Sequence, residues 1–354
     1  MRIDRLLAKK NTVILCLFLC AFLLLGCGSG ESTKKVVLTT GLAEDEVFRI
    51  ETISCYEPEM MVYLTNLQNQ YENVYGEEIW NTQVDGKSLE NNVKDNALAK
   101  MAQVKTMNLM AKSMGIELDA SEEKQIEKIT EIYYGSLTKT EIELMGIDKE
   151  TIHSLYKEYY IAQKVYQEII KDINPEVSDD EARNITIEYI LIKTYYQDGT
   201  GKKIEFEGND REDAYERAKT ACERAKAGED FDLLISEYNE SDKSTASYGK
   251  SDIEDVAIRN ILFNMASDEV SDVMRVSDGY MIAKVLSTYD LEQTDANKIT
   301  IVEQEREAVF GEQYDAYVVD LTRKLNDTLW EQMRFIHDPN VTTSNFFAVA
   351  DENM

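Results

Sequence analysis

Histidine, cysteine and carboxylate side chains are the groups that most often bind metals, transfer protons or act as nucleophiles. The chain has 354 residues but only two histidines, His153 and His337, and neither lies in a pattern with metal-ligand spacing. The sequence contains no Ser-His-Asp arrangement, phosphate-binding loop or nucleotide-binding fingerprint. We therefore expect neither a metal site nor a bound cofactor.

Cys27 is the cysteine with the clearest predicted chemistry, because of the segment that precedes it. The first ten residues are positively charged, and residues 12–25 form an apolar run too short for a comfortable membrane span. The run ends at Leu24-Leu-Gly-Cys27, which resembles the lipobox of bacterial lipoproteins. The resemblance implies a signal peptide over residues 1–26, lipid on Cys27 and a flexible tether over residues 27–44. The alternative is an uncleaved anchor in which the cysteine is incidental.

Two further cysteines, Cys55 and Cys222, lie outside this N-terminal segment. The favoured interpretation is that each is a small buried hydrophobe. A disulfide between them is the alternative, although nothing in the sequence places them together.

The balance of charges is strongly acidic, since 67 Asp and Glu residues against 38 Lys and Arg give a net charge of −29. Nucleic acids and anionic lipid surfaces repel such a chain, so we expect no nucleic-acid partner. High charge also favours solubility, which suits a protein that handles sticky partners; a generally acidic proteome is the alternative explanation. The length predicts two or three domains.

The elements best defined by their patterns lie between Ile185 and Leu286. Residues 185–194 are apolar and β-branched, as in a buried central strand, and a polar loop follows over residues 198–210. Ser277-Asp-Gly279 between two β-rich runs is a strong hairpin signal. In chain order we expect a strand, a loop, three helices with apolar residues at 214–225, 231–238 and 258–265, and a hairpin of residues 270–276 and 280–286.

Four short fragments occur in this stretch in a specific order: Tyr189-Ile-Leu-Ile-Lys193, Ala225-Lys-Ala-Gly-Glu-Asp-Phe231 running into Ser236-Glu-Tyr238, Asp268-Glu-Val-Ser271 and Asp278-Gly-Tyr-Met-Ile282. Their order and sequences resemble those of the parvulin-type (PpiC-like) peptidyl-prolyl isomerase domain. The resemblance implies a small antiparallel sheet flanked by helices over residues 184–290. It also implies rotamase activity, which accelerates rotation about Xaa-Pro peptide bonds.

The active-site residues that this resemblance implies are replaced by other residue types in this chain. The first family histidine falls on Tyr189, the second on Met281, and the central Cys or Asp near Ser241 or Asp242. In the family these groups form a hydrogen-bonded floor beneath the amide, whose rotation has a barrier of about 18–20 kcal/mol. Tyr189 keeps a hydroxyl, but the Met281 thioether cannot donate a hydrogen bond. We therefore expect weak or absent catalysis, although a reaction without a covalent step could retain activity from shape alone.

The proline pocket is rewritten as well. The resemblance places it near Glu254 and Ile258, with Phe263 as a further pocket residue. The glycine-rich loop of the family is reduced to Tyr248-Gly-Lys-Ser-Asp252.

Helical patterns dominate both flanks of this domain. Apolar stripes predict helices around residues 60–74, 89–109 and 152–169, and Asp119-Ala-Ser-Glu122 predicts a capping box that opens another. Residues 299–335 read as one long charged helix that packs back on the N-terminal helices, and residues 338–354 as a frayed polar tail.

Two fragments, Gly115-Ile-Glu-Leu-Asp-Ala-Ser121 and Glu176-Val-Ser-Asp-Asp-Glu181, are similar to recurring sequences of the chaperone domain in SurA and PrsA foldases. The resemblance implies an α+β protein in which both ends of the chain build a helical chaperone body and the parvulin-like domain is an insertion. We place the helical domain at residues 45–183, a returning C-terminal helix at 291–337 and a tail at 338–354.

Together these resemblances imply an extracytoplasmic foldase, anchored to the membrane through Cys27, that binds unfolded or newly secreted polypeptides. Methionines at 101, 107, 110 and 114 could adapt to apolar clients, or could simply fill a helical core. One alternative function is a working isomerase with a substituted site. Another is a lipoprotein that binds a single partner or solute.

Overall fold

The computed structural model describes residues 41–84, 86–199 and 201–353. The signal peptide, the lipobox with Cys27 and most of the tether lie outside these residues. The chain divides into two compact units: unit 1 contains the residues up to Lys171 and those from Phe310 onward, and unit 2 runs from Asp172 to Val309. Within the described ranges, no helix is long and apolar enough to cross a membrane.

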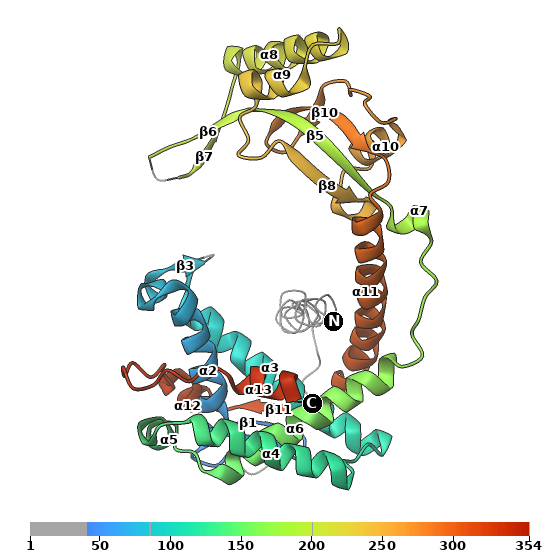
Figure 1. Cartoon of the computed structure of the whole chain (residues 1–354). Helices are drawn as coiled ribbons and strands as arrows, with labels where there is room; N and C mark the ends of the chain where they lie inside the picture. Colours follow the sequence, from blue (N-terminus) through green and yellow to red (C-terminus); the bar gives the residue numbers. More distant parts are fainter. Residues whose placement is uncertain (1–40, 85, 200, 354) are drawn as a thin grey trace. The chain divides into compact units, whose positions relative to one another are not determined.

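Unit 2 is built on a four-stranded antiparallel sheet in the order β8-β5-β10-β9 (Figure 1). Its strands are β5 (Asn184–Lys193), β8 (Thr245–Gly249), β9 (Met274–Val276) and β10 (Gly279–Ser287). The helices are α7 (Asp179–Ala182), α8 (Asn209–Lys226), α9 (Phe231–Tyr238), α10 (Val256–Asn264) and the first part of α11 (Leu291–Val318), with a 3-10 turn η3 (Lys250–Asp252) after β8.

The two faces of this sheet are covered by different helices, because side chains alternate along each strand. Ile190 and Ile192 of β5 pack with Ile282 of β10 against α8 and α9. The neighbouring positions, such as Ile187 and Ala283, belong to a cluster on the opposite face that includes residues of α10. The sequence-predicted central strand, the three helices and the hairpin are therefore confirmed.

The region expected to be a plain loop after β5 contains a small hairpin instead. Strands β6 (Tyr195–Gln197) and β7 (Lys203–Glu205) pair antiparallel. The Lys203 ammonium lies 4.3 Å from the centre of the Tyr195 ring. This cross-strand contact stabilises the pairing of β6 with β7, which the polar composition of the segment did not predict.

Unit 1 is mainly helical. Its long helices are α2 (Glu57–Tyr75), α3 (Leu89–Met114), α4 (Ala120–Ser136) and α6 (Lys149–Ile170), joined by the shorter α5 (Lys139–Met145), the 3-10 turn η2 (Glu77–Asn81) and the hairpin of β3 (Gln83–Val84) and β4 (Lys87–Ser88). The predicted capping box is present, since Asp119 accepts hydrogen bonds from the first turn of α4 and Glu122 accepts one from the Asp119 N–H.

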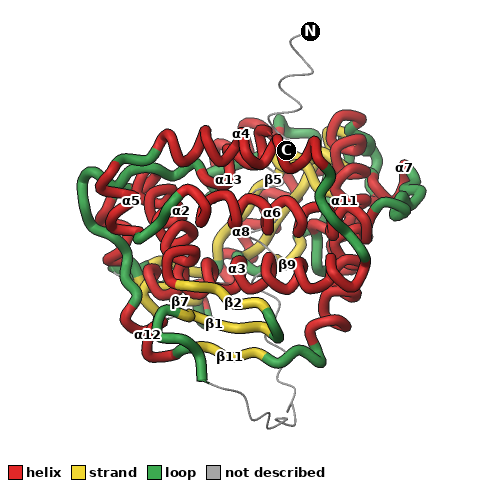
Figure 2. Tube along the Cα trace, turned by 90° about the horizontal axis from the view of Figure 1, so that it is seen from below, coloured by secondary structure: helices red, strands yellow, loops and turns green. Residues whose placement is uncertain are grey.

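A three-stranded sheet in the order β11-β1-β2 completes unit 1 (Figure 2). It consists of β1 (Glu46–Ile50), β2 (Ile53–Tyr56) and β11 (Arg323–Leu325). The prediction of one helix over residues 299–335 is therefore wrong, because α11 ends at Val318 and is followed by β11 and the short α12 (Asp327–Gln332). Pairing of β11 with the edge of β1 satisfies backbone groups there and overrides the helical pattern.

The prediction of a frayed tail is also wrong. Residues Phe346–Asn353 form helix α13, whose Phe346 is fully buried and Phe347 nearly so. Burial of the apolar surface of these two aromatic rings stabilises the end of the chain in the core of unit 1. Cys55 and Cys222 are both buried and free, so the interpretation as small hydrophobes is confirmed and the disulfide is not formed.

Candidate functional site

The predicted site residues Tyr189 and Met281 lie on the same face of the unit 2 sheet. In the ladder between β5 and β10, Tyr189 is opposite Ala283 and Met281 is opposite Leu191. The two side chains are therefore diagonal neighbours on adjacent strands. Both belong to the cluster on the α10 side of the sheet, which we call the α10-face cluster. Its buried members are Ile185, Ile187, Leu262, Phe263, Met265, Met274, Met281, Ala283 and Val285, and Tyr189, Leu191, Tyr248, Ile253, Ile258 and Val276 pack against them.

The loop after α9 brings Ser241 to Tyr189. The Asn239 side chain accepts a hydrogen bond from the Leu191 N–H at 2.9 Å, and the Glu240 N–H donates to the Leu191 carbonyl at 2.8 Å. Farther along, the Tyr189 N–H donates to the Ser244 carbonyl at 2.8 Å. These bonds fix the loop along the edge of β5 before β8 begins.

As a result, the hydroxyl groups of Tyr189 and Ser241 lie 3.3 Å apart. The Ser241 hydroxyl also accepts from the Lys243 N–H at 3.3 Å. The sequence left Ser241 and Asp242 as alternatives for the central position. In the structure Ser241 pairs with Tyr189, whereas the Asp242 side chain is exposed to solvent.

The predicted pocket residues separate in the same way. Ile258 and Phe263, both on α10, belong to the α10-face cluster, and Phe263 is buried. Glu254 is exposed in the loop before α10 and is not a member of that cluster. The structure thus brings together Tyr189, Ser241, Met281, Ile258 and Phe263.

Two residues that were not predicted for the site also lie there, one of them at the start of the expected glycine-rich loop. Tyr248 and Ile253 pack against the α10-face cluster, and burial raises the pKa of the Tyr248 hydroxyl, with a smaller contribution from Tyr189. Tyr248 lies on β8 opposite Ile185 of β5, so it belongs to the central sheet. Apolar residues alternate along β5, and the same alternation applied to the neighbouring strand β8 could have predicted that Tyr248 faces this cluster.

Residues 190–287 match the rotamase family model described as the PPIC-type PPIASE domain. The chain carries a PPIC-type isomerase domain. This PPIC-type domain comprises the four-stranded sheet, α8, α9 and α10, and its α10-face cluster contains four of the residues predicted for the site, Tyr189, Met281, Ile258 and Phe263.

Relatives extend the similarity beyond the PPIC-type domain. The chain is 23% identical over 330 residues to the foldase protein PrsA of Clostridium botulinum strain Langeland, covering 87% of this chain and 93% of the relative. The foldase protein PrsA of strain Loch Maree is 22% identical over 349 residues, covering 92% of this chain and 98% of that protein. The expected similarity to PrsA foldases is thus confirmed over most of the chain, at low sequence identity.

Among solved structures, the peptidylprolyl isomerase PrsA of Bacillus cereus is 16% identical, with 76% of this chain and 97% of that chain covered and a TM-score of 0.38. PrsA of Streptococcus pneumoniae is also 16% identical, covering 77% of this chain and 98% of that chain with a TM-score of 0.30.

The chemistry available in this PPIC-type domain is that of neutral hydrogen bonds and apolar contacts. Both histidines of the chain lie outside unit 2, His153 on α6 and His337 after α12. Two hydroxyl groups, from Tyr189 and Ser241, can donate and accept, while Met281 presents an apolar thioether. The predicted site residues therefore combine apolar groups with a small polar pair.

Proposed function

We propose that this chain is an extracytoplasmic foldase that binds unfolded polypeptides and retains little or no isomerase activity. The observation that carries the proposal is the PPIC-type domain, in a chain similar to PrsA over most of its length, with a hydroxyl pair and a thioether at its site. Binding needs only apolar surface, which half-buried members of the α10-face cluster such as Tyr189, Leu191 and Ile258 provide. Catalysis also needs donors that stabilise the twisted amide, and Met281 supplies none.

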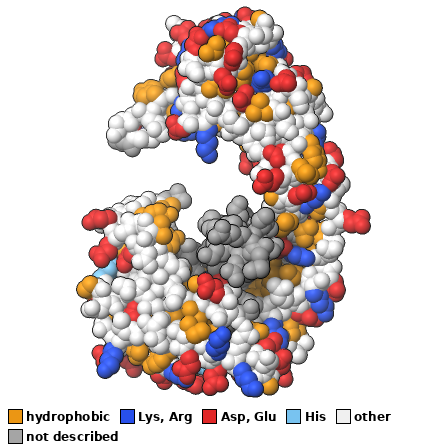
Figure 3. Space-filling view, viewed as in Figure 1, with side chains coloured by type: hydrophobic (Ala, Val, Ile, Leu, Met, Phe, Trp, Pro, Cys, Tyr) orange, Lys and Arg blue, Asp and Glu red, His pale blue; other side chains and the backbone are white. Residues whose placement is uncertain are grey.

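Apolar surface on unit 1 supports a role in holding clients. Val74 and Tyr75, at the end of α2, are 70% and 64% exposed, and Val84 on β3 is also exposed. The Tyr71 ring lies between Tyr75 and Trp80, with ring centroids at 6.3 and 5.7 Å. Figure 3 shows apolar side chains at the surface around β3. Rigid aromatic groups supply contact area at little entropy cost, which suits binding of varied apolar segments.

Exchange NMR on a short Xaa-Pro peptide tests the catalytic part of the proposal, with protein that lacks residues 1–27. We expect line broadening from binding without faster cis–trans exchange. Acceleration that is lost on Tyr189→Phe would instead favour a working isomerase, the alternative that the hydroxyl pair supports.

Suppression of aggregation tests the chaperone part. We expect the protein to slow aggregation of several unfolded secreted proteins at near-stoichiometric ratios. A single saturable ligand with no effect on any unfolded client would favour a lipoprotein dedicated to one partner.

Membrane anchoring is proposed from the lipobox alone. We expect the protein to fractionate with the membrane, on its outer face, and Cys27→Ala to release it into the soluble fraction. Mass spectrometry of the mature N-terminus should show acyl chains on Cys27. An unmodified Cys27 in a membrane-bound chain would mean an uncleaved anchor.

A further inference from the structure

The C-terminal segment of the chain, residues 336–353, lies against the helices of unit 1 in an unusual way. Residues 336–345 have no regular structure apart from a turn, and α13 follows (Figure 1). Helices in a core usually contact one another through side chains. Here the polar side chains of α2, α5 and α6 hydrogen bond mainly to the backbone of the segment.

Gln68 of α2 shows this most clearly. Its side-chain oxygen accepts from the Ile336 N–H at 2.9 Å, and its side-chain nitrogen donates to the Ile336 carbonyl at 3.0 Å. Gln68 is 1% exposed. One buried amide thus pairs with both backbone groups of a residue, as a neighbouring strand would, whatever the side chain of that residue is.

Glu141 of α5 binds the next part of the segment. One oxygen of this fully buried carboxylate accepts from the N–H groups of Thr342 and Thr343, at 2.9 and 2.8 Å. Its other oxygen accepts from the Thr138 N–H at 2.7 Å and closes the cap of α5. A buried carboxylate needs such donors, and here two of them come from the backbone of the segment.

Three more side chains of α2 continue the pattern toward α13. Asn69 donates to the Thr343 carbonyl at 2.9 Å, and Gln70 donates to the Ser344 carbonyl at 3.0 Å. The Asn66 side chain accepts from the Phe346 N–H at 2.9 Å. We call Asn66, Gln68, Asn69, Gln70 and Glu141 the backbone-binding set.

An aromatic pocket ends the row. The Phe346 ring stacks on Tyr156 with centroids 4.4 Å apart and an interplanar angle of 6°, and it meets the Tyr133 ring at 5.2 Å. Phe347 meets the Tyr63 ring edge-on at 5.0 Å. The pocket therefore receives two adjacent aromatic side chains, and its rings favour aromatic residues at these two positions. We call the backbone-binding set together with this pocket the groove.

We propose that this groove is a binding site for extended polypeptide and that residues 336–353 occupy it as an internal substitute for a client. The occupant it fits is an unfolded stretch with two adjacent aromatic residues, held through its backbone by the backbone-binding set. The segment leaves when a client competes for the groove. This inference rests on the proposed foldase function and adds its site and its mode of recognition.

The test cross-links the segment in place. Asn73 on α2 donates to the Ser344 hydroxyl at 3.1 Å in an exposed position, so cysteines at these two positions can be joined by a bismaleimide that contains a disulfide. The full chain is used in detergent micelles, with Cys16, Cys20 and Cys27 replaced by serine. The probe is a labelled peptide with the sequence of residues 336–353. We expect the cross-linked protein to bind this probe at least about tenfold more weakly, with recovery on reduction. Equal binding before and after reduction would overturn the proposal.

A second variant changes the C-terminal segment and leaves the residues of the groove unaltered, so the affinity for the probe should rise instead of fall. Phe346→Leu weakens docking of the segment, so we expect it to bind the probe several-fold more tightly than the parent. Thr342→Ala is the matched control, because the Thr342 side chain is exposed and its backbone N–H is kept. A purely structural segment predicts the reverse, namely weaker or unchanged binding by Phe346→Leu.

The same proteins distinguish this inference from the foldase proposal. If no variant slows client aggregation but the probe still binds better to Phe346→Leu, the groove is real and the foldase proposal fails. If clients are held equally by cross-linked and reduced protein, the foldase proposal stands and the groove is not the client site.

Discussion

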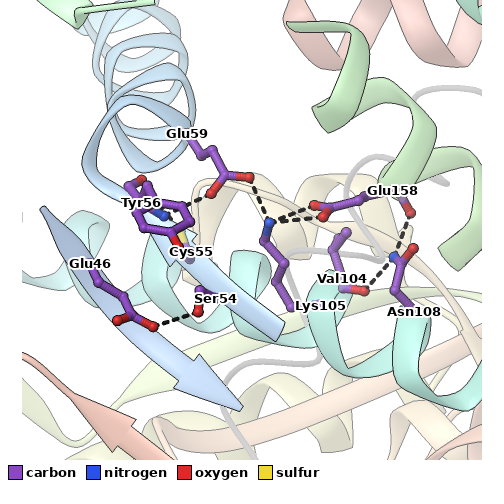
Figure 4. A network of polar contacts seen from close by, with 9 residues as sticks. All are labelled: Glu46, Ser54, Cys55, Tyr56, Glu59, Val104, Lys105, Asn108 and Glu158. Carbon is purple, nitrogen blue, oxygen red and sulfur yellow. Dashed lines mark hydrogen bonds and ion pairs between the residues drawn. The ribbon is translucent and has the colours of Figure 1, made fainter. Parts of the chain in front are cut away.

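Lys105 of α3 forms an ion pair with Glu158 of α6, at 2.8 Å, although the lysine side chain is only 2% exposed (Figure 4). Its ammonium also contacts Glu59 of α2 at 2.6 Å. Burial opposes charge on Lys105, but Glu158 and Glu59 outweigh it and raise the pKa of the ammonium. One lysine thus joins three helices of unit 1.

Replacing this lysine should destabilise unit 1 strongly. Lys105→Met keeps the volume but leaves two carboxylates close together without a cation, so we expect a loss of about 3–5 kcal/mol in the free energy of unfolding. Urea unfolding followed by hydrogen exchange in α3 measures it. Lys149→Met is the matched control, because Lys149 and Glu131 form an exposed pair worth about 0–1 kcal/mol. Equal losses in both variants would contradict the buried role of Lys105.

Glu46 should make unit 1 sensitive to acid. Its carboxylate accepts hydrogen bonds from Arg49 at 2.6 Å and Ser54 at 2.5 Å, and these, with Arg49 contributing most, lower its pKa to about 2. A carboxylate with a depressed pKa stabilises the fold above its unfolded pKa and loses that contribution as pH falls through the folded value.

We therefore expect Glu46→Gln to cost about 1–3 kcal/mol at pH 7. The difference from the parent should shrink below the ordinary pKa of 4.5 and vanish near pH 2. Unfolding measured at several pH values gives the result. A difference that stays constant from pH 7 to pH 2 would show that the carboxylate charge is not what stabilises β1.

Restoring histidines should test the proposal that their absence limits catalysis by the PPIC-type domain. The sequence resemblance places the family histidines at Tyr189 and Met281, so we expect the double variant Tyr189→His, Met281→His to raise the rate of peptide isomerisation by about tenfold or more. Asp242→Asn is the control, because this exposed side chain does not contact the hydroxyl pair and should leave the rate unchanged. The rate comes from the same exchange NMR. A folded double variant with no gain would place the defect elsewhere, for example in the proline pocket.

Gly279 should be required for the hairpin of β9 and β10. Its φ is +152°, and a Cβ atom there would lie 2.0 Å from the Ile192 carbonyl oxygen on β5. Because the clashing atoms belong to the backbone of β5, they cannot move without distorting the sheet. We therefore expect Gly279→Ala to lower the free energy of unfolding by about 2 kcal/mol or more. Gly135→Ala, in open space on α4, should instead be neutral or stabilise by up to about 1 kcal/mol. Hydrogen exchange in β10 reports the first change; full protection in Gly279→Ala would contradict it.

Local patterns in the sequence determined most of unit 2 and several helix ends of unit 1. Alternation along residues 184–193, the Asp278-Gly279 turn and the Asp119–Glu122 capping box each involve residues a few positions apart. Such signals depend on backbone geometry within one element, so they can be predicted without knowing its neighbours.

Only the tertiary structure decided which residues far apart in the chain share an environment. It placed Ser241, and not Asp242, beside Tyr189, because the Asn239 loop bonds to the edge of β5. It turned residues 323–325 into a strand and the expected tail into α13, where pairing with β1 and burial of Phe346 outweigh weak local preferences. Backbone pairing and aromatic burial join segments separated by hundreds of residues, and no local period in the sequence records them.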